Sequence, residues 1–178
     1  MLRSIRYGEA DRVVHLYSAT RGRIGAIAKG SRRPKSRFGG RLEPFFRLNL
    51  VLYEGRGDLC TVTGASTING HPRLRSDGPA LMAAGRGCDA VLRLLNSEEA
   101  NQAAYNLLCN YLALLGADPA AASAPGAALA FRLKLARAAG FRLVSTEMSA
   151  PIGQEFGRVF EEQNLGIPFE EALDALTE

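Results

Sequence analysis

Apolar and polar positions alternate along the first 70 residues, in short runs that are separated by turn signals. These runs are rich in β-branched and aromatic residues, which favour strands, and glycine or proline lies between them. The pattern predicts five strands, within residues 1–7, 12–17, 24–28, 45–53 and 59–63. In the fourth strand, Phe46 and three leucines share one face, which is expected to be core. Closing such a short sheet removes its exposed edges, so we expect a small closed β-barrel of the OB-fold type.

Beyond His71-Pro72 the apolar positions recur with a period of 3.6 residues, which indicates amphipathic helices. One helix is expected over 81–95, and a second from an N-cap at Ser97 to Gly116. An Ala/Pro-rich connection is expected at 118–126, and three further helices within 129–139, 152–160 and 168–176. The sequence therefore predicts an α+β protein of two domains, an OB-fold β-barrel at 1–70 and an α-helical bundle at 71–178.

Charge is divided unevenly between these two parts. Residues 1–75 hold 15 Lys/Arg and five Asp/Glu, a net charge of +10. Residues 76–178 hold seven Lys/Arg and thirteen Asp/Glu, a net charge of −6. A basic module joined to an acidic one favours a nucleic-acid surface on the basic module.

The positive charge is densest in a segment that we call the basic loop, residues 29–46. It holds six cations and a single carboxylate, Glu43. Its glycines and prolines prevent a continuous helix or a central strand, and strand-like runs lie on both sides of it. A basic loop held by a β-scaffold can follow a phosphate backbone without reading bases. A solvated, disordered connection is the alternative.

The predicted DNA-binding side chains are the cations of the basic loop and their neighbours. Arg21 and Arg23, on the turn before the third strand, are expected to extend the same patch. Arg47 lies on the outer face of the fourth strand, beside aromatic residues that form either a stacking platform or a surface packed under the loop. Phe38 either stacks on an unpaired base or anchors the loop to the barrel. The predicted set is Arg21, Arg23, Lys29, Arg32, Arg33, Lys35, Arg37, Phe38, Arg41 and Arg47.

No motif for catalysis or metal binding is found. The sequence lacks a nucleophile elbow, a P-loop, a dinucleotide fingerprint and a His-Glu-x-x-His zinc site. The three cysteines form no CxxC pair, and their number favours buried thiols in a reducing cytoplasm. No apolar run reaches the roughly 18–20 residues of a membrane span. We therefore expect a binding protein that is not an enzyme and has no cofactor, no metal and no membrane partner.

Two stretches of the chain stand out as motifs: residues 2–17, LRSIRYGEADRVVHLY, and residues 28–45, AKGSRRPKSRFGGRLEPF. Both resemble RecO, a family of bacterial DNA repair and recombination proteins. The resemblance is specific to about residue 75, becomes looser to about residue 141, and implies an OB-fold followed by a helical domain. It also implies a mediator that binds single- and double-stranded DNA, anneals complementary strands and helps RecR to load RecA. Single-stranded-DNA-binding protein, through its C-terminal tail, would be a further partner, and the location would be the cytoplasm, at the nucleoid.

The sequence departs from the RecO pattern in its second half. Many members carry a four-cysteine zinc site soon after the position of Gly140, whereas no cysteine follows Cys109 here, so we expect no zinc. From about Ser145 the resemblance to RecO ends, and residues 150–173 look more like a cytoplasmic segment of type II secretion F proteins. The first strand is also short at its start. The alternative interpretation is therefore a protein-interaction module, or a truncated or fused fragment, without repair activity.

Overall fold

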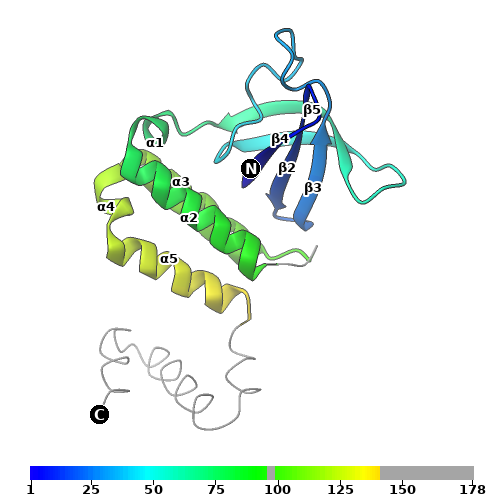
Figure 1. The fold of residues 1–178 in the computed structure, drawn as a ribbon. Helices are drawn as coiled ribbons and strands as arrows, with labels where there is room; N and C mark the ends of the chain where they lie inside the picture. The colour runs from blue at the N-terminus through cyan, green and yellow to red at the C-terminus, as the bar shows by residue number, and fades with distance from the viewer. Residues whose placement is uncertain (96–98, 141–178) are drawn as a thin grey trace, which may run out of the picture. The chain divides into compact units, whose positions relative to one another are not determined.

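A computed structural model of the chain describes residues 1–95 and 99–140. Met1–Leu135 form one compact unit. In this unit a five-stranded sheet is followed by helices (Figure 1), which confirms the predicted α+β class. The strands are β1 (Arg3–Tyr7), β2 (Asp11–Ser18), β3 (Gly22–Ala28), β4 (Arg47–Tyr53) and β5 (Cys60–Asn69).

The strands lie in the order β1-β2-β3-β5-β4. Neighbouring strands are antiparallel except β3 and β5, which run parallel with Ala26 opposite Cys60. A parallel pair needs a crossover, and the basic loop together with β4 supplies it. The alternation predicted for the fourth strand is confirmed for its leucines, because Leu48, Leu50 and Leu52 are half-buried between exposed neighbours. Phe46, expected on the same face, lies before β4 begins and outside the core of the sheet.

The core of the sheet is built from small, β-branched and aliphatic side chains, which suit the narrow interior of a short sheet. The basic loop adds two larger side chains to this core. The buried residues of this core are Val14, Leu16, Ile24, Ala26, Ala28, Phe38, Leu42 and Val62.

The expectation of a closed barrel is wrong. β1 and β4 are the two edges of the sheet, and β1 pairs along its length with β2 alone. Just before these two edge strands begin, the Met1 amino group donates to the Phe46 carbonyl oxygen and the Met1 carbonyl oxygen accepts from the Phe45 N–H. A cavity of about 500 Å³ lies next to these residues, and Met1, Phe46 and Leu50 are among the residues that line it. Tyr17 also lines it, and the buried Tyr17 hydroxyl has no hydrogen-bond partner among the described residues.

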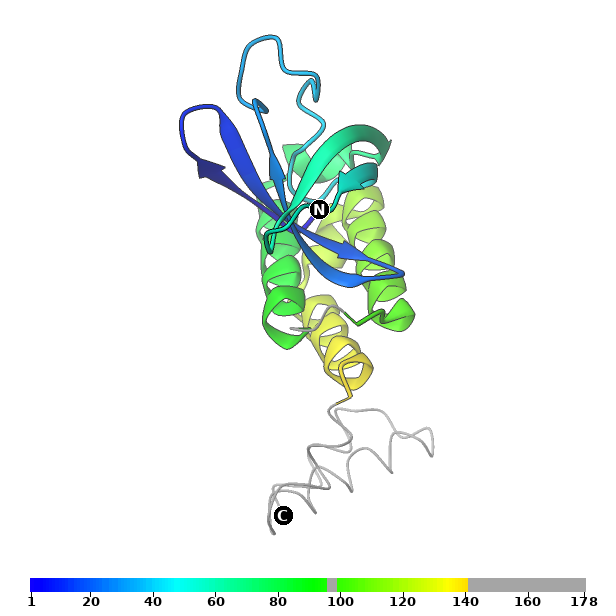
Figure 2. The ribbon, with the colours of Figure 1, turned by 90° about the vertical axis from the view of Figure 1, so that its right-hand side faces the viewer.

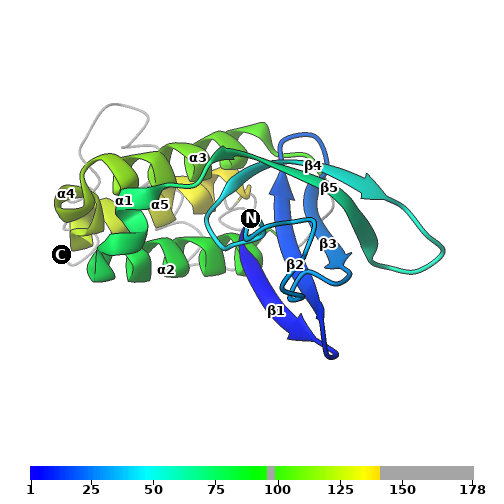
Figure 3. The ribbon, with the colours of Figure 1, turned by 90° about the horizontal axis from the view of Figure 1, so that it is seen from above.

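The described helical region holds α1 (Pro72–Ser76), α2 (Gly78–Leu94), α3 (Gln102–Ala117), α4 (Pro119–Ser123) and α5 (Pro125–Ala138). Figure 3 shows α2 and α3 running alongside each other, with α5 visible between them. The Tyr111 and Phe131 rings stack between α3 and α5 with centroids 4.2 Å apart. Gly87 of α2 faces these rings, and a Cβ added there would lie 3.0 Å from Tyr111. Because Gly87 has no side chain, α2 can pack closely against the Tyr111 and Phe131 rings.

Two details of the predicted helices are wrong: one is a helix start, and the other is a stretch predicted as a connection that holds a helix. α3 begins after Asn101, whose side chain accepts from the Ala104 N–H, rather than after Ser97. The expected connection at 118–126 holds α4 and the start of α5, because Asp118 caps α4 through the Ala121 N–H. The helices expected at 152–160 and 168–176 lie outside the described residues.

Candidate nucleic-acid interface

The basic loop folds as a chain of successive turns rather than as an open connection. Backbone hydrogen bonds join residues three apart, from Arg33 to Gly30, from Ser36 to Arg33 and from Gly39 to Ser36, with N···O distances of 2.9–3.2 Å. Gly30, at φ 67°, takes a conformation that favours glycine, and its N–H donates to Asp11 Oδ1 at 2.7 Å. Local hydrogen bonds thus replace the sheet ladder that this composition prevents.

Two apolar side chains fix the loop to the sheet. Phe38 and Leu42 are each only 2% exposed and belong to the core of the sheet. The prediction that Phe38 stacks on a base is therefore wrong, because a buried ring has no free face to offer. The alternative, that Phe38 is an anchor for the loop, agrees with its place in the core of the open sheet. The Arg37 guanidinium lies 5.0 Å from the centroid of the Phe38 ring.

The cations of the loop differ in what holds them. Arg37 donates to the Val62 carbonyl oxygen at 3.2 Å, and Arg41 donates to two carbonyl oxygens of the loop itself. Arg32 makes a long contact of 3.5 Å with the Gly8 carbonyl oxygen, where the β1–β2 turn lies beside the loop (Figure 2). These bonds fix side-chain direction without neutralising charge, since a carbonyl oxygen carries no net charge.

Three loop cations, Lys29, Arg33 and Lys35, have no side-chain hydrogen bond or ion pair in the described part of the chain. All six loop cations are exposed, and none of them pairs with a carboxylate there. A dense positive charge is consequently open to solvent at one end of the sheet. Such a surface suits a polyanion.

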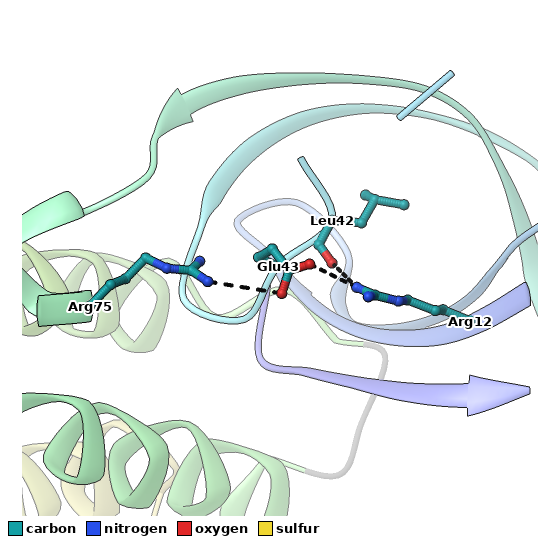
Figure 4. Close-up of polar contacts among 4 residues, drawn as sticks. All are labelled: Arg12, Leu42, Glu43 and Arg75. Carbon is teal, nitrogen blue, oxygen red and sulfur yellow. Dashed lines mark hydrogen bonds and ion pairs between the residues drawn. The ribbon is translucent and has the colours of Figure 1, made fainter. Parts of the chain in front are cut away.

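The one carboxylate of the loop, Glu43, lies between two arginines from distant elements (Figure 4). Arg12 of β2 donates to Glu43 Oε1 at 2.9 Å and to the Leu42 carbonyl oxygen at 3.1 Å. Arg75 of α1 lies 4.0 Å from Glu43 Oε2. We did not predict either arginine from the sequence. The signal was a lone carboxylate in a run of cations, which indicates a cationic partner without saying which one.

Two of the other predicted site residues, Arg21 and Arg23, lie away from the loop. Arg21 pairs with Glu54, and Arg23 donates to the Leu92 carbonyl oxygen at 3.3 Å. Both stand at the start of β3, whereas the loop leaves its far end, six residue steps or about 20 Å away. The structure therefore does not join them to the loop in one patch.

The outer face of β4 carries the last predicted cation. The Arg47 guanidinium lies 5.9 Å from the centroid of the Tyr105 ring of α3. At the other end of β4, Tyr53 is 65% exposed, so it is a surface aromatic that does not pack under the loop. An exposed aromatic ring beside polar strand positions remains available for stacking.

The described residues offer little acid–base or metal chemistry. No group of three or more His, Cys, Asp or Glu side chains there is arranged to hold a metal ion. Burial, followed by the nearby positive charge of the amino terminus, lowers the pKa of His71. Burial also raises the pKa of the Cys88 thiol to about 12, so this thiol is unreactive. Within the described part, no helix combines the length and apolar character needed to cross a membrane.

Comparison with known proteins gives the family. Residues 1–71 match the family model "Recombination protein O N terminal", and residues 75–165 match "Recombination protein O C terminal". The chain is 38% identical over 158 residues to DNA repair protein RecO of Anaeromyxobacter dehalogenans strain 2CP-C, covering 86% of this chain and 61% of that protein.

Two further relatives agree with this match. DNA repair protein RecO of Rubrobacter xylanophilus is 39% identical over 141 residues, 79% of this chain and 55% of the relative. DNA repair protein RecO of Geobacter sulfurreducens is 35% identical over 156 residues, 88% of this chain and 62% of the relative. The chain thus spans about three-fifths of the length of the curated relatives it matches. On these matches, the chain belongs to the RecO family.

Proposed function

We propose that this chain is a non-enzymatic DNA-binding protein of repair and homologous recombination, and that the basic loop holds the phosphate backbone. One observation carries the proposal. Six exposed cations stand on a segment anchored by Phe38 and Leu42, and no carboxylate of the described residues neutralises them. The names of the RecO relatives, which are DNA repair proteins, support the same role.

Electrostatics explains how such a loop acts on DNA. Each phosphate that a cation neutralises releases counterions, so the affinity falls as salt concentration rises. The contacts carry no base information, so binding to both single and double strands is expected. A surface that holds two negatively charged strands close together also promotes the annealing of complementary strands.

The finer parts of the proposal follow family membership. We propose that RecR and the C-terminal tail of single-stranded-DNA-binding protein are partners, and that RecA is loaded indirectly. The proposed location is the cytoplasm, at the nucleoid, and no cofactor is proposed. Pull-down of purified RecR and of single-stranded-DNA-binding protein with and without its tail tests the partners. If neither RecR nor single-stranded-DNA-binding protein is retained, the partner proposals are rejected and only the DNA-binding proposal stands.

The test of DNA binding uses the three loop cations that hold nothing else in place. We expect Lys29→Ala, Arg33→Ala and Lys35→Ala together to weaken binding of single-stranded DNA by about tenfold or more in low salt. The slope of log affinity against log salt should fall by about 2 in magnitude, since each single-strand contact contributes about 0.7. Fluorescence anisotropy with a labelled oligonucleotide across a salt series measures both quantities.

The control removes the same charge from the helical part. Arg86, Arg93 and Arg132 are all exposed there, and their replacement by alanine also lowers the net charge by three. If this control weakened binding as much as the loop variant, net charge rather than the loop would govern binding. The proposed interface would then be abandoned.

A further inference from the structure

The Glu43 cluster joins three separate elements at the end of the basic loop. Glu43 comes from the loop, Arg12 from β2 and Arg75 from α1. One carboxylate thus faces two guanidinium groups, which leaves a net positive charge at this point. Figure 4 shows Glu43 between the two arginines, which approach it from opposite sides.

The two arginines are held very differently. Arg12 is satisfied by two good hydrogen bonds, at 2.9 and 3.1 Å, and its side chain is 28% exposed. Arg75 lies 4.0 Å from the carboxylate, which is beyond hydrogen-bond range, and its side chain is 41% exposed. A guanidinium has five N–H donors, so most of those on Arg75 face no partner among the described residues.

Arg75 is nevertheless positioned. Its guanidinium lies 5.1 Å from the centroid of the Phe46 ring, a cation–π contact, while Glu43 attracts it from the side. The preceding residue, Leu74, is fully buried and fixes α1 beneath it. A guanidinium that is aimed but largely unsatisfied, with its donors open to solvent, suits a bidentate phosphate contact.

We propose that Arg75 binds a phosphate of the DNA backbone and carries the path of the strand from the basic loop onto α1. Glu43 and Phe46 are positioning residues for this contact, and the inference rests on the proposed DNA-binding function. Arg41, the last loop cation, is two residues before Glu43, so their Cα atoms are at most about 7.6 Å apart. Glu43 in turn lies 4.0 Å from the Arg75 guanidinium, so one strand can reach both Arg41 and Arg75.

The helix supplies its own control. Arg73 is also an exposed arginine of α1, but two residues correspond to about 200° of rotation, so it points away from Arg75. Arg73→Ala and Arg75→Ala therefore remove the same charge from the same element on different sides. The measurements are anisotropy with duplex and single-stranded oligonucleotides across a salt series, and thermal unfolding of each variant.

We expect Arg75→Ala to weaken DNA binding by about fivefold in low salt and to reduce the salt slope by about 0.9 on duplex and about 0.7 on single strands. Arg73→Ala should stay within about twofold of the unmodified chain. Arg75→Lys should restore the slope, because it keeps the charge.

Two outcomes would overturn the inference. One is an equal effect of the two alanine variants. The other is a lower melting temperature for Arg75→Ala with an unchanged salt slope, which would make Arg75 a staple between α1 and the loop. Failure of the proposed function gives a separate result, since the triple loop variant would then keep its affinity. If the loop variant loses affinity and Arg75→Ala does not, only the path onto α1 is rejected.

Discussion

The basic loop and the packed helices are held in place by opposite means. The loop has no regular element, and two large apolar side chains, Phe38 and Leu42, fix it to the core. The helices rely instead on a missing side chain, because Gly87 lets the Tyr111 and Phe131 rings approach α2. Apolar anchors thus fix the loop, while its own cations form no ion pair with a carboxylate among the described residues. Its cations are therefore left free for a ligand.

Charge is used differently in the two regions as well. On α2, Arg93 donates to Asp89 at 2.8 Å, one turn away on an exposed face, a pair that contributes little to stability. In the loop, the arginines with partners donate to carbonyl oxygens, which leaves their charge intact. Arginines that donate to carbonyl oxygens are held in a fixed direction and keep their positive charge.

The largest effect is expected from removal of the loop anchor. Phe38→Ala should lower the free energy of unfolding by about 3–5 kcal/mol, because a buried aromatic side chain is lost and a cavity remains. DNA affinity should fall with it even though no cation is changed. Urea unfolding followed by circular dichroism measures the stability, and anisotropy measures the affinity.

Tyr53→Ala is the matched control for that prediction. Tyr53 is an aromatic residue of the same sheet but is 65% exposed, so its loss should change stability by no more than about 0.5 kcal/mol. Equal stability changes for the two variants would mean that Phe38 does not hold the loop, and the contrast drawn between the loop and the helices would be wrong.

A smaller pair of effects is expected on α2, with opposite signs at two glycines. A Cβ at Gly87 would lie 3.0 Å from Tyr111 and 3.3 Å from Phe131, so Gly87→Ala should destabilise by about 1–2 kcal/mol. At Gly85 a Cβ would meet nothing within 4 Å, so Gly85→Ala should stabilise by about 0.5–1 kcal/mol through helix propensity. Thermal unfolding of both variants decides the matter. Stabilisation by Gly87→Ala would show that the close approach is not needed.

Local pattern was sufficient to predict most of the sheet. Strand alternation identified the inward leucines of β4. Helix ends were harder, since Asn101 and Asp118 cap their helices with side chains that also suit loops. The Ala/Pro-rich stretch before Gly126 is typical of a connection, yet one capped turn makes it the helix α4.

For the candidate site, the sequence predicted the cluster of cations but not the long-range contacts around it. The six loop cations are adjacent in sequence, so their clustering needed no tertiary information. Whether Phe38 faces inward depends on a core that no local pattern describes. The contacts of Glu43 span 31 residues to Arg12 and 32 residues to Arg75, and neither partner follows from spacing. Long-range pairing is what sequence pattern lacks.

The joint between the sheet and the helices gives the smallest effect, and it is a pH effect. His71 lies between β5 and α1 with φ 45°, its N–H donates to Asn69 Oδ1 at 2.9 Å, and its side chain is close to Gly116. Burial, and then the positive charge of the amino terminus, lowers the pKa of His71 below its ordinary value of 6.5. The folded state thus prefers the neutral imidazole.

The sign of the effect follows from proton binding. Below pH 6.5 the unfolded chain takes up a proton at His71 that the folded chain resists, so the free energy of unfolding should fall as pH decreases from 7 towards 5.5. His71→Asn removes the titration and keeps a side chain that tolerates positive φ. His15 also has a pKa lowered by burial and then by Arg23 and Arg3, so some pH dependence should persist in the variant. In urea unfolding at several pH values, the free energy of unfolding should therefore fall less steeply with decreasing pH for His71→Asn. Identical pH dependence in the two proteins would mean that protonation of His71 does not affect stability.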